Sequence, residues 1–290
     1  MKNLKLAAVC LSCLTMTGCS ALNFSVEGLI NAPKLTSEQS EIHQALIESV
    51  GSNITLKYPK NGEYRSAYVI ANIDDEPTDE AMVFYEYTSN GSEEDGLRVN
   101  ILDKDEDGKW YSVKELAGAG TDIDQVIISP MGSNNQTDVF VGYQNLTNDE
   151  KTMEIYSYTD GDFKRVALDT YSVLEPLDIN NDGYIELITI QRSTNNDTGA
   201  VTAKASMLNM KNNEITRGEN VDMCDNVTSY VSSKTGMLDS GRRAIFIDGL
   251  TADGKLQTEI IYYRYSGLQN PMQLRSEKLL PLCTRPAGYY

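Results

Sequence analysis

Residues 152–168 read TMEIYSYTDGDFKRVAL, two short apolar runs joined by Asp160 and Gly161. Apolar residues in these runs follow the two-residue period of a β-strand rather than the period of a helix. Asp and Gly tolerate the positive φ angles of a tight hairpin turn. The stretch therefore predicts two adjacent antiparallel strands.

The same pattern recurs through most of the chain. Four groups of four runs cover residues 66–116, 124–168, 173–221 and 228–274. The last hairpin of each group is predicted to turn at Asp107-Gly108, Asp160-Gly161, Asn212-Asn213 and Ser266-Gly267, so that the groups repeat about every fifty residues. Four strands per period is typical of propeller blades. We expect an all-β fold, a β-propeller of four-stranded blades over residues 66–290, with a β-sandwich of accidental spacing as the alternative.

A fifth group begins at residues 279–282, LLPL, and the sequence given stops at Tyr290. Two explanations fit this pattern. The last segment could close a small ring by pairing with an early blade. Alternatively, the chain is a truncated piece of a longer propeller. The expectation is therefore about four blades plus the start of a fifth.

The N-terminus reads MKNLKLAAVCLSCLTMTGCS over residues 1–20. Two lysines precede an uncharged apolar run, residues 6–14, that is too short to span a bilayer but suits the core of a signal peptide. The ending Thr17-Gly18-Cys19 resembles the lipobox of bacterial lipoproteins. The resemblance implies that residues 1–18 are removed as a signal peptide and that Cys19 carries lipid.

On this reading, residues 19–35 form a lipidated tether and the protein is anchored to the cell membrane on the extracytoplasmic side. An ordinary signal peptide that happens to contain Cys19 is the alternative. Besides Cys19, the mature chain has two cysteines, Cys224 and Cys283. They could form a disulfide in an exported protein or stay as two thiols, because their spacing is not diagnostic.

Residues 36–65 are predicted to hold a short helix and a lead-in to the repeats. Thr36 is a good N-cap, and Gln39 completes a capping box. An apolar face then follows at helical spacing, and Gly51 can end the helix. Its apolar face comprises Ile42, Ala45, Leu46 and Ile47.

The most chemically specific stretch is DINNDGYIE, residues 178–186. Oxygen-bearing side chains stand at positions one, three, five and nine, and Gly at position six permits a sharp turn. Calcium takes 6–8 oxygen ligands, so the loop is a candidate structural calcium site. The candidate ligands are Asp178, Asn180, Asp182, the Tyr184 carbonyl and Glu186. A solvated polar turn that binds nothing is the alternative. An EF-hand is excluded, because Thr189 stands at position twelve and a strand follows.

This loop and the apolar strand after it resemble FG-GAP and VCBS-type repeats, the integrin-alpha-like propellers. The resemblance implies structural calcium and ligand binding by the assembled propeller. The other groups depart from the pattern; in the first, Pro77 replaces the Gly, which makes a metal there doubtful. Residues 103–108, DKDEDG, look similar to the acidic loop, but we interpret them as a hairpin turn because Trp110 and Tyr111 follow at once. The chain also resembles uncharacterised lipoproteins of anaerobic Firmicutes, which implies no activity.

Charge and composition exclude several functions. The net charge of −17 argues against nucleic acid as a partner, because phosphate binding needs clustered Lys and Arg. The single histidine, His43, lies outside the repeats, and the sequence contains neither G-x-S-x-G nor H-E-x-x-H. We expect a non-catalytic, surface-anchored binding or scaffolding module for an extracellular protein or glycan. The alternatives are an extracellular carboxylate-dependent hydrolase of glycans or peptides and an accessory subunit of a membrane complex.

Overall fold

The computed structural model describes residues 35–270, apart from 89–95, 131–136, 146–149, 195–196, 212–213, 226 and 266. The chain divides into two compact units, Met1–Ser40 and Glu41–Tyr290. The described part of the first unit holds the N-cap and first turn of helix α3 (Ser37–Val50). The described strands all belong to the second unit.

Helix α3 begins with the predicted capping box. The Gln39 N–H donates to Thr36 Oγ1, and the Thr36 N–H donates to Gln39 Oε1, both at 3.1 Å. Gly51 follows the helix with φ at +85°, a conformation that glycine adopts without strain. Ile47, expected on the apolar face, is only half-buried. The buried residues are Ile42, Ala45 and Leu46.

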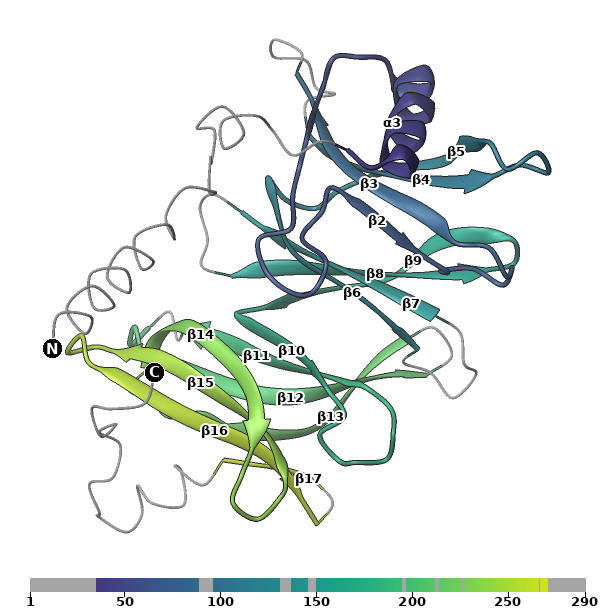
Figure 1. Cartoon of the computed structure of the whole chain (residues 1–290). Helices are drawn as coiled ribbons and strands as arrows, with labels where there is room; N and C mark the ends of the chain where they lie inside the picture. The colour runs from purple at the N-terminus through teal and green to yellow at the C-terminus, as the bar shows by residue number, and fades with distance from the viewer. Residues whose placement is uncertain are drawn as a thin grey trace, which may run out of the picture. The chain divides into compact units, whose positions relative to one another are not determined.

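The strands form four antiparallel sheets, which confirms the all-β class and the grouping of the runs (Figure 1). The first sheet contains β1 (Ile54–Leu56), β2 (Tyr68–Ala71), β3 (Glu80–Tyr87), β4 (Leu97–Lys104) and β5 (Trp110–Ala117). The second contains β6 (Asp122–Pro130), β7 (Thr137–Gln144), β8 (Lys151–Thr159) and β9 (Asp162–Tyr171). The third contains β10 (Val173–Leu177), β11 (Glu186–Thr194), β12 (Val201–Lys211) and β13 (Glu214–Asp222). The fourth contains β14 (Val227–Met237), β15 (Arg243–Thr251), β16 (Leu256–Arg264) and β17 (Gly267–Gln269).

In the last three sheets the order of strands follows the chain, as in a simple meander. The first sheet differs, because both β1 and β2 pair with β3. Strand β4 occupies the other edge of β3, so β1 and β2 share one edge, end to end. The sequence interpretation placed 36–65 in a helix and lead-in and missed β1, which is too short to show a strand period.

The predicted turn at Asp160 and Gly161 is confirmed. Both residues have positive φ, 55° and 72°, and the flanking Thr159 and Asp162 pair across the hairpin. The turn at Gly108 is also as expected, with φ at +77°. These positions are where the chain reverses between the last two strands of a sheet.

The prediction for the final hairpin is wrong by one residue. Gly267 lies in β17 and pairs with Arg264, so it is not part of the turn. Tyr265 carries the positive φ, at 63°. The register is set by burial, because Leu268 is buried opposite Tyr263. The residues Asn212 and Asn213 of the third group lie outside the described residues.

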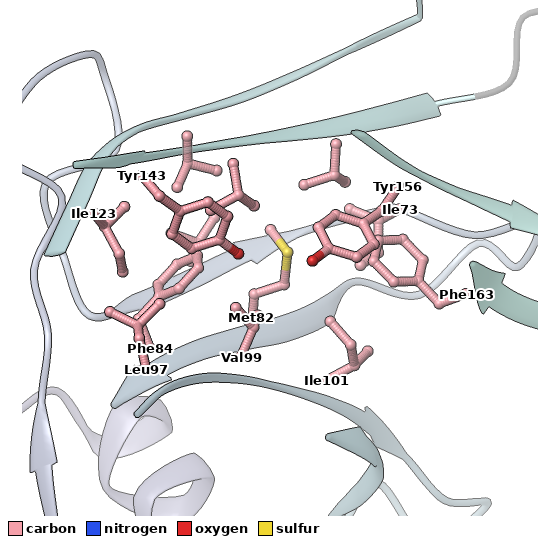
Figure 2. Close-up of a cluster of buried hydrophobic side chains, with 14 residues drawn as sticks. Ile73, Met82, Phe84, Leu97, Val99, Ile101, Ile123, Tyr143, Tyr156 and Phe163 are labelled. Atoms are coloured by element: carbon pink, nitrogen blue, oxygen red, sulfur yellow. The ribbon is translucent and has the colours of Figure 1, made fainter. Parts of the chain in front are cut away.

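Apolar clusters join neighbouring sheets in order along the chain. Between the first and second sheets, Met82, Phe84 and Val99 pack against Tyr143 and Tyr156 (Figure 2). A second cluster joins the second and third sheets, and a third joins the third and fourth. Helix α3 packs on the opposite side of the first sheet, in a cluster that includes Trp110. Each sheet is therefore a layer held by its neighbours through buried side chains.

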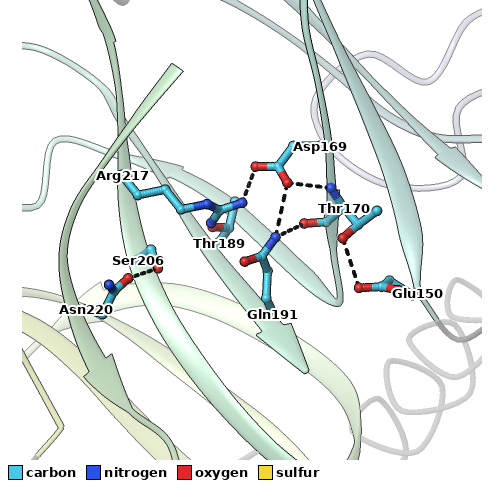
Figure 3. Close-up of polar contacts among 8 residues, drawn as sticks. All are labelled: Glu150, Asp169, Thr170, Thr189, Gln191, Ser206, Arg217 and Asn220. Carbon is cyan, nitrogen blue, oxygen red and sulfur yellow. Dashed lines mark hydrogen bonds and ion pairs between the residues drawn. The ribbon is translucent and has the colours of Figure 1, made fainter. Parts of the chain in front are cut away.

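Polar contacts add to the joint between the second and third sheets (Figure 3). Arg217 on β13 forms an ion pair with Asp169 on β9. Gln191 on β11 donates to Asp169 Oδ1 at 3.1 Å and to the Thr170 carbonyl at 2.8 Å. These contacts fix the last strand of the second sheet against the third.

Candidate functional site

The first strands of the last three sheets, β6, β10 and β14, line one cavity of about 660 Å³. The segment 61–64, which precedes β2, completes its wall. That segment is held in place because the Asn61 N–H donates to the Asp124 carbonyl at 2.7 Å. Gln125 Nε2 on β6 donates to the Leu174 carbonyl on β10 at 2.9 Å, which joins two of the wall strands. The volume is in the range of small-molecule sites.

The floor of the cavity holds a closed ion-pair network around Asp124, whose side chain is only 2% exposed. Lys151 Nζ lies 2.8 Å from Asp124 Oδ1, and Asn61 Nδ2 donates to the same oxygen at 2.8 Å. The Tyr171 hydroxyl donates to Asp124 Oδ2 at 2.7 Å. Lys151 also lies over the Tyr171 ring, 5.6 Å from its centroid. Both carboxylate oxygens are thus satisfied, as burial of a charge requires.

Glu175 on β10 is the second carboxyl in the wall. The Ser233 hydroxyl on β14 donates to its Oε1. Burial raises the pKa of Glu175, and this effect outweighs the lowering by the Ser233 hydrogen bond and by the charge of Lys151. Glu175 therefore places a desolvated carboxyl between β10 and β14.

The rest of the wall is mixed in polarity. Val231 on β14 and Ile185 supply exposed apolar surface, and Glu63 is also exposed. Val126, Val173 and Leu174 line the cavity too, but they are almost fully buried in the clusters between sheets. Such a wall can hold an apolar body and orient it through a few polar groups. Sequence reasoning missed this site, although carboxyls within apolar first runs, such as Glu175 in VLEPL, were a signal.

The acidic loop connects β10 to β11, and its predicted side chains do come together. The Asp182 N–H donates to Asp178 Oδ1 at 3.1 Å and to Asn180 Oδ1 at 2.8 Å. The Tyr184 N–H donates to Asp182 Oδ1 at 2.9 Å. Gly183 has φ at +93°, as expected for the sharp turn. Asn181 also has positive φ, at 62°.

Two side chains, those of Asn180 and Arg243, already form hydrogen bonds or an ion pair with the carboxylates of this loop. Asn180 Nδ2 donates to Asp182 Oδ2 at 2.9 Å and to Glu186 Oε1 at 2.8 Å. Arg243 Nη1, from the start of β15, lies 3.0 Å from Asp178 Oδ2 and donates to the Asp178 carbonyl at 3.0 Å. The guanidinium supplies positive charge at the first position of the loop.

Glu186 is buried, and the Ile179 N–H donates to its Oε2 at 3.0 Å. Burial raises its pKa to about 7, and the charges of Asp182 and Asp178 add to the rise. A cation bound beside the carboxyls of Glu186, Asp182 and Asp178 would lower the pKa of Glu186, because it favours the ionised form.

The donor set fits calcium in kind, with hard oxygens on one turn. A cation at the centre of the loop requires the Asn180 amide to present its oxygen in place of Nδ2. Within the described residues, no three His, Cys, Asp or Glu side chains already converge as a preformed metal cluster.

The loop between β2 and β3 repeats part of this design. The Ile73 N–H donates to Glu80 Oε2 at 2.8 Å, as the Ile179 N–H does to Glu186. Burial raises the pKa of Glu80 to about 7, with contributions from Asp74 and Asp103. The repeat relationship between the first and third sheets therefore extends to buried side-chain contacts.

Several predicted sites lie outside the described residues. They are residues 1–18, Cys19, Cys283 and the run at 279–282. The signal peptide and the lipidation stay predictions, and the two alternatives for Cys224 and Cys283, a disulfide or two thiols, are untested. Among the described helices, none has the length and apolar character needed to cross a bilayer.

No family model matches the chain, and no curated protein matches it. Among solved structures, the chain is similar to a "putative 6-phosphogluconolactonase" from Bacteroides uniformis, with 13% identity, a TM-score of 0.36, and coverage of 75% of this chain and 66% of that one. A second protein so described, from Bacteroides fragilis, gives 10% identity, a TM-score of 0.34, and coverage of 77% and 67%. A "putative exo-beta-1,3-galactanase" from Bifidobacterium bifidum gives 12% identity, a TM-score of 0.27, and coverage of 75% and 75%. The chain thus spans about two thirds of the length of the first two, and likenesses this weak carry no argument about activity.

Proposed function

We propose that this protein is a lipid-anchored binding module on the extracytoplasmic side of the cell membrane, and that its ligand site is the cavity between β6, β10 and β14. The observation that carries the proposal is the convergence of three first strands and segment 61–64 on one cavity of about 660 Å³. Concave sites with apolar walls and a few fixed polar groups are the usual form of ligand sites.

The finer architecture belongs to the same proposal: a β-propeller of four-stranded blades preceded by a short helix. Successive sheets joined by apolar clusters, and first strands gathered on one cavity, support it. The run at residues 279–282, which lies outside the described residues, would begin a fifth blade or close the ring. The ligand would be an extracellular protein or glycan, or a small molecule derived from one.

The anchor rests on the lipobox-like Thr17-Gly18-Cys19. Two acyl chains on Cys19 would give stable membrane attachment. We expect Cys19→Ala to move the protein from the membrane fraction to the soluble fraction, or to leave it uncleaved, as judged by fractionation and mass. A Cys19→Ala protein that is still processed and membrane-bound would refute the anchor.

Structural calcium in the acidic loop is also proposed. Asp178, Asn180, Asp182, Glu186 and the Tyr184 carbonyl would hold it. A bound calcium ion would neutralise the loop and brace the connection between β10 and β11; it has no role in a chemical step.

The cavity assignment is tested with a matched pair of substitutions. Val231 and Val113 are 59% and 56% exposed, but only Val231, on β14, lines the cavity. A panel of glycans, peptides and small amines is screened for thermal stabilisation of the full-length chain. We expect a stabilising ligand whose effect is lost in Val231→Trp and kept in Val113→Trp, without turnover. Equal effects in both variants would refute the assignment.

A second candidate function is hydrolysis of glycans or peptides by cavity carboxyls. The observation that favours it is the presence in one cavity of Glu175, whose pKa burial raises, and Asp124, which forms an ion pair with Lys151. Carboxyls in contrasting environments are typical of acid–base sites. Product release from an oligosaccharide or peptide, abolished in Glu175→Gln, would favour this function over binding alone.

A further inference from the structure

The cavity wall is acidic, and this property decides which ligand it can take. Its charged side chains are those of Glu63, Asp124 and Glu175 against that of Lys151. An anionic ligand would therefore meet net repulsion, which is strengthened by the chain's net charge of −17.

Lys151 is not available to offset a ligand's negative charge, because it is already engaged. Its Nζ lies 2.8 Å from Asp124, above the ring of Tyr171. Asp124 in turn accepts from Tyr171 and Asn61. Breaking this network would leave a buried charge unpaired, which is costly. The network is therefore a neutral, fixed part of the wall.

Glu175 differs from Asp124. The Lys151 charge that acts on Glu175 already forms an ion pair with Asp124. One Glu175 oxygen accepts from the Ser233 hydroxyl, and the Lys151 charge acts on Glu175 only from a distance. A cationic group placed beside Glu175 would compensate for its desolvation. Tyr64 also lines the cavity, and an aromatic ring can bind a cation on its face.

Apolar wall residues complete the match. Val231 and Ile185 line the cavity and are 59% and 36% exposed, so they can cover a short hydrocarbon body. Resting on the proposed function, we propose that the cavity binds an organic cation, with an ammonium group at the Glu175 carboxylate and an apolar body against these residues. The ligand class is a primary amine, free or at the end of a larger molecule.

The test uses the full-length chain in detergent and three probes of equal length: hexylamine, hexan-1-ol and hexanoate. Calorimetric titrations at about pH 8 keep the amine cationic. We expect hexylamine to bind roughly tenfold more tightly than hexan-1-ol, and hexanoate to bind more weakly than either. This comparison needs no variant, so a failure of any variant to fold leaves it intact.

Substitutions then test whether Glu175 causes the preference for the amine. Glu175→Gln should remove the roughly tenfold preference for the amine and leave hexan-1-ol binding unchanged. Asp160→Asn, in the exposed hairpin between β8 and β9, should leave all three affinities unchanged. Equal affinities for the three probes would overturn the cation preference while keeping the cavity as a ligand site. Absence of binding by all three would overturn both the preference and the cavity as a small-ligand site.

Discussion

Arg243 Nη1 lies 3.0 Å from Asp178 Oδ2 and also donates to the Asp178 carbonyl at 3.0 Å. The two residues are 65 positions apart and belong to different sheets. Arg243 begins β15, just as Glu186 begins β11. At the start of its second strand the fourth sheet thus has Arg243, where the third sheet has Glu186. The Arg243 side chain contacts the acidic loop of the third sheet.

Loss of this contact should destabilise the fold. Asp178 is buried, so Arg243→Gln leaves its carboxylate with fewer partners. Because the Arg243 side chain is 41% exposed, we expect a loss of only about 1 kcal/mol in the free energy of unfolding. Urea denaturation measures it, with Lys255→Gln as a control that breaks an exposed ion pair with Asp253. Equal stability of the two variants would contradict the role given to Arg243.

Calcium should stabilise the protein through the acidic loop. At a hundredfold excess over Kd, binding to the folded state alone raises the free energy of unfolding by about 2.7 kcal/mol. We expect this rise to be largely lost in Asp182→Asn, which keeps an acceptor for the Tyr184 N–H but removes the charge. The matched control is Asp105→Asn in the hairpin turn between β4 and β5, where Asp105 Oδ1 accepts from Lys109.

Unfolding is followed in calcium and in chelator for each chain. An identical shift in Asp182→Asn and Asp105→Asn would place the ion elsewhere, and no shift in the unmodified chain would make the loop a plain turn. Arg243→Gln should bind calcium more tightly than the unmodified chain, because it removes a competing positive charge from Asp178.

Glu80 should make stability fall as pH rises. Its pKa is about 7 in the folded protein, whereas an unperturbed glutamate has a pKa of 4.5. Between these pH values the folded state therefore binds more protons than the unfolded state. Its contribution is therefore present at low pH and lost as pH rises through about 7. In Glu80→Gln the decline between about pH 5 and pH 8 should shrink, by an amount on the order of 1–3 kcal/mol.

The control for this prediction is Glu86→Gln on the same strand, which removes a half-exposed carboxylate paired with Lys57. Urea denaturation across the pH range compares the three chains. A pH profile that Glu86→Gln changes as much as Glu80→Gln does would show that burial of Glu80 is not the cause.

Gly142 on β7 should not tolerate a side chain. A Cβ there would overlap the Tyr171 hydroxyl, the group that donates to Asp124. Overlap of this kind costs about 1–3 kcal/mol, so Gly142→Ala should unfold at a lower urea concentration. Tyr171→Phe removes the clashing oxygen, so the double variant should lose less stability than the sum of the two single changes. Strict additivity would contradict the packing of Tyr171 against Gly142.

Local sequence pattern was sufficient for the order of the strands in the last three sheets, where that order follows the chain. Apolar runs with strand period, separated by turn residues, predicted four groups that match the four sheets, and the Thr36–Gln39 capping box formed as expected. Where burial competes with turn propensity, the pattern failed. Gly267 was assigned to the last turn, but Tyr265 takes the positive φ because Leu268 must face the core.

The acidic loop and the cavity also differ in how far the sequence could predict them. The acidic loop is contiguous, so its spacing alone brought Asp178, Asp182 and Glu186 together. The cavity is assembled from segments that are far apart in sequence, and Glu175 meets Ser233 across 58 positions. No local pattern encodes such a meeting, because it depends on how whole sheets pack. The same holds for Arg243 and Asp178.

The central claim is that the cavity between β6, β10 and β14 is the ligand site. Methyl NMR of the full-length chain, titrated separately with hexylamine and hexan-1-ol, tests it most directly. The account predicts shifts at the methyl groups of Val231 and Ile185, which line the cavity, with none at Val113 or Leu168, which are exposed outside it. Shifts confined to Val113 and Leu168, or no shifts with either probe, would contradict it.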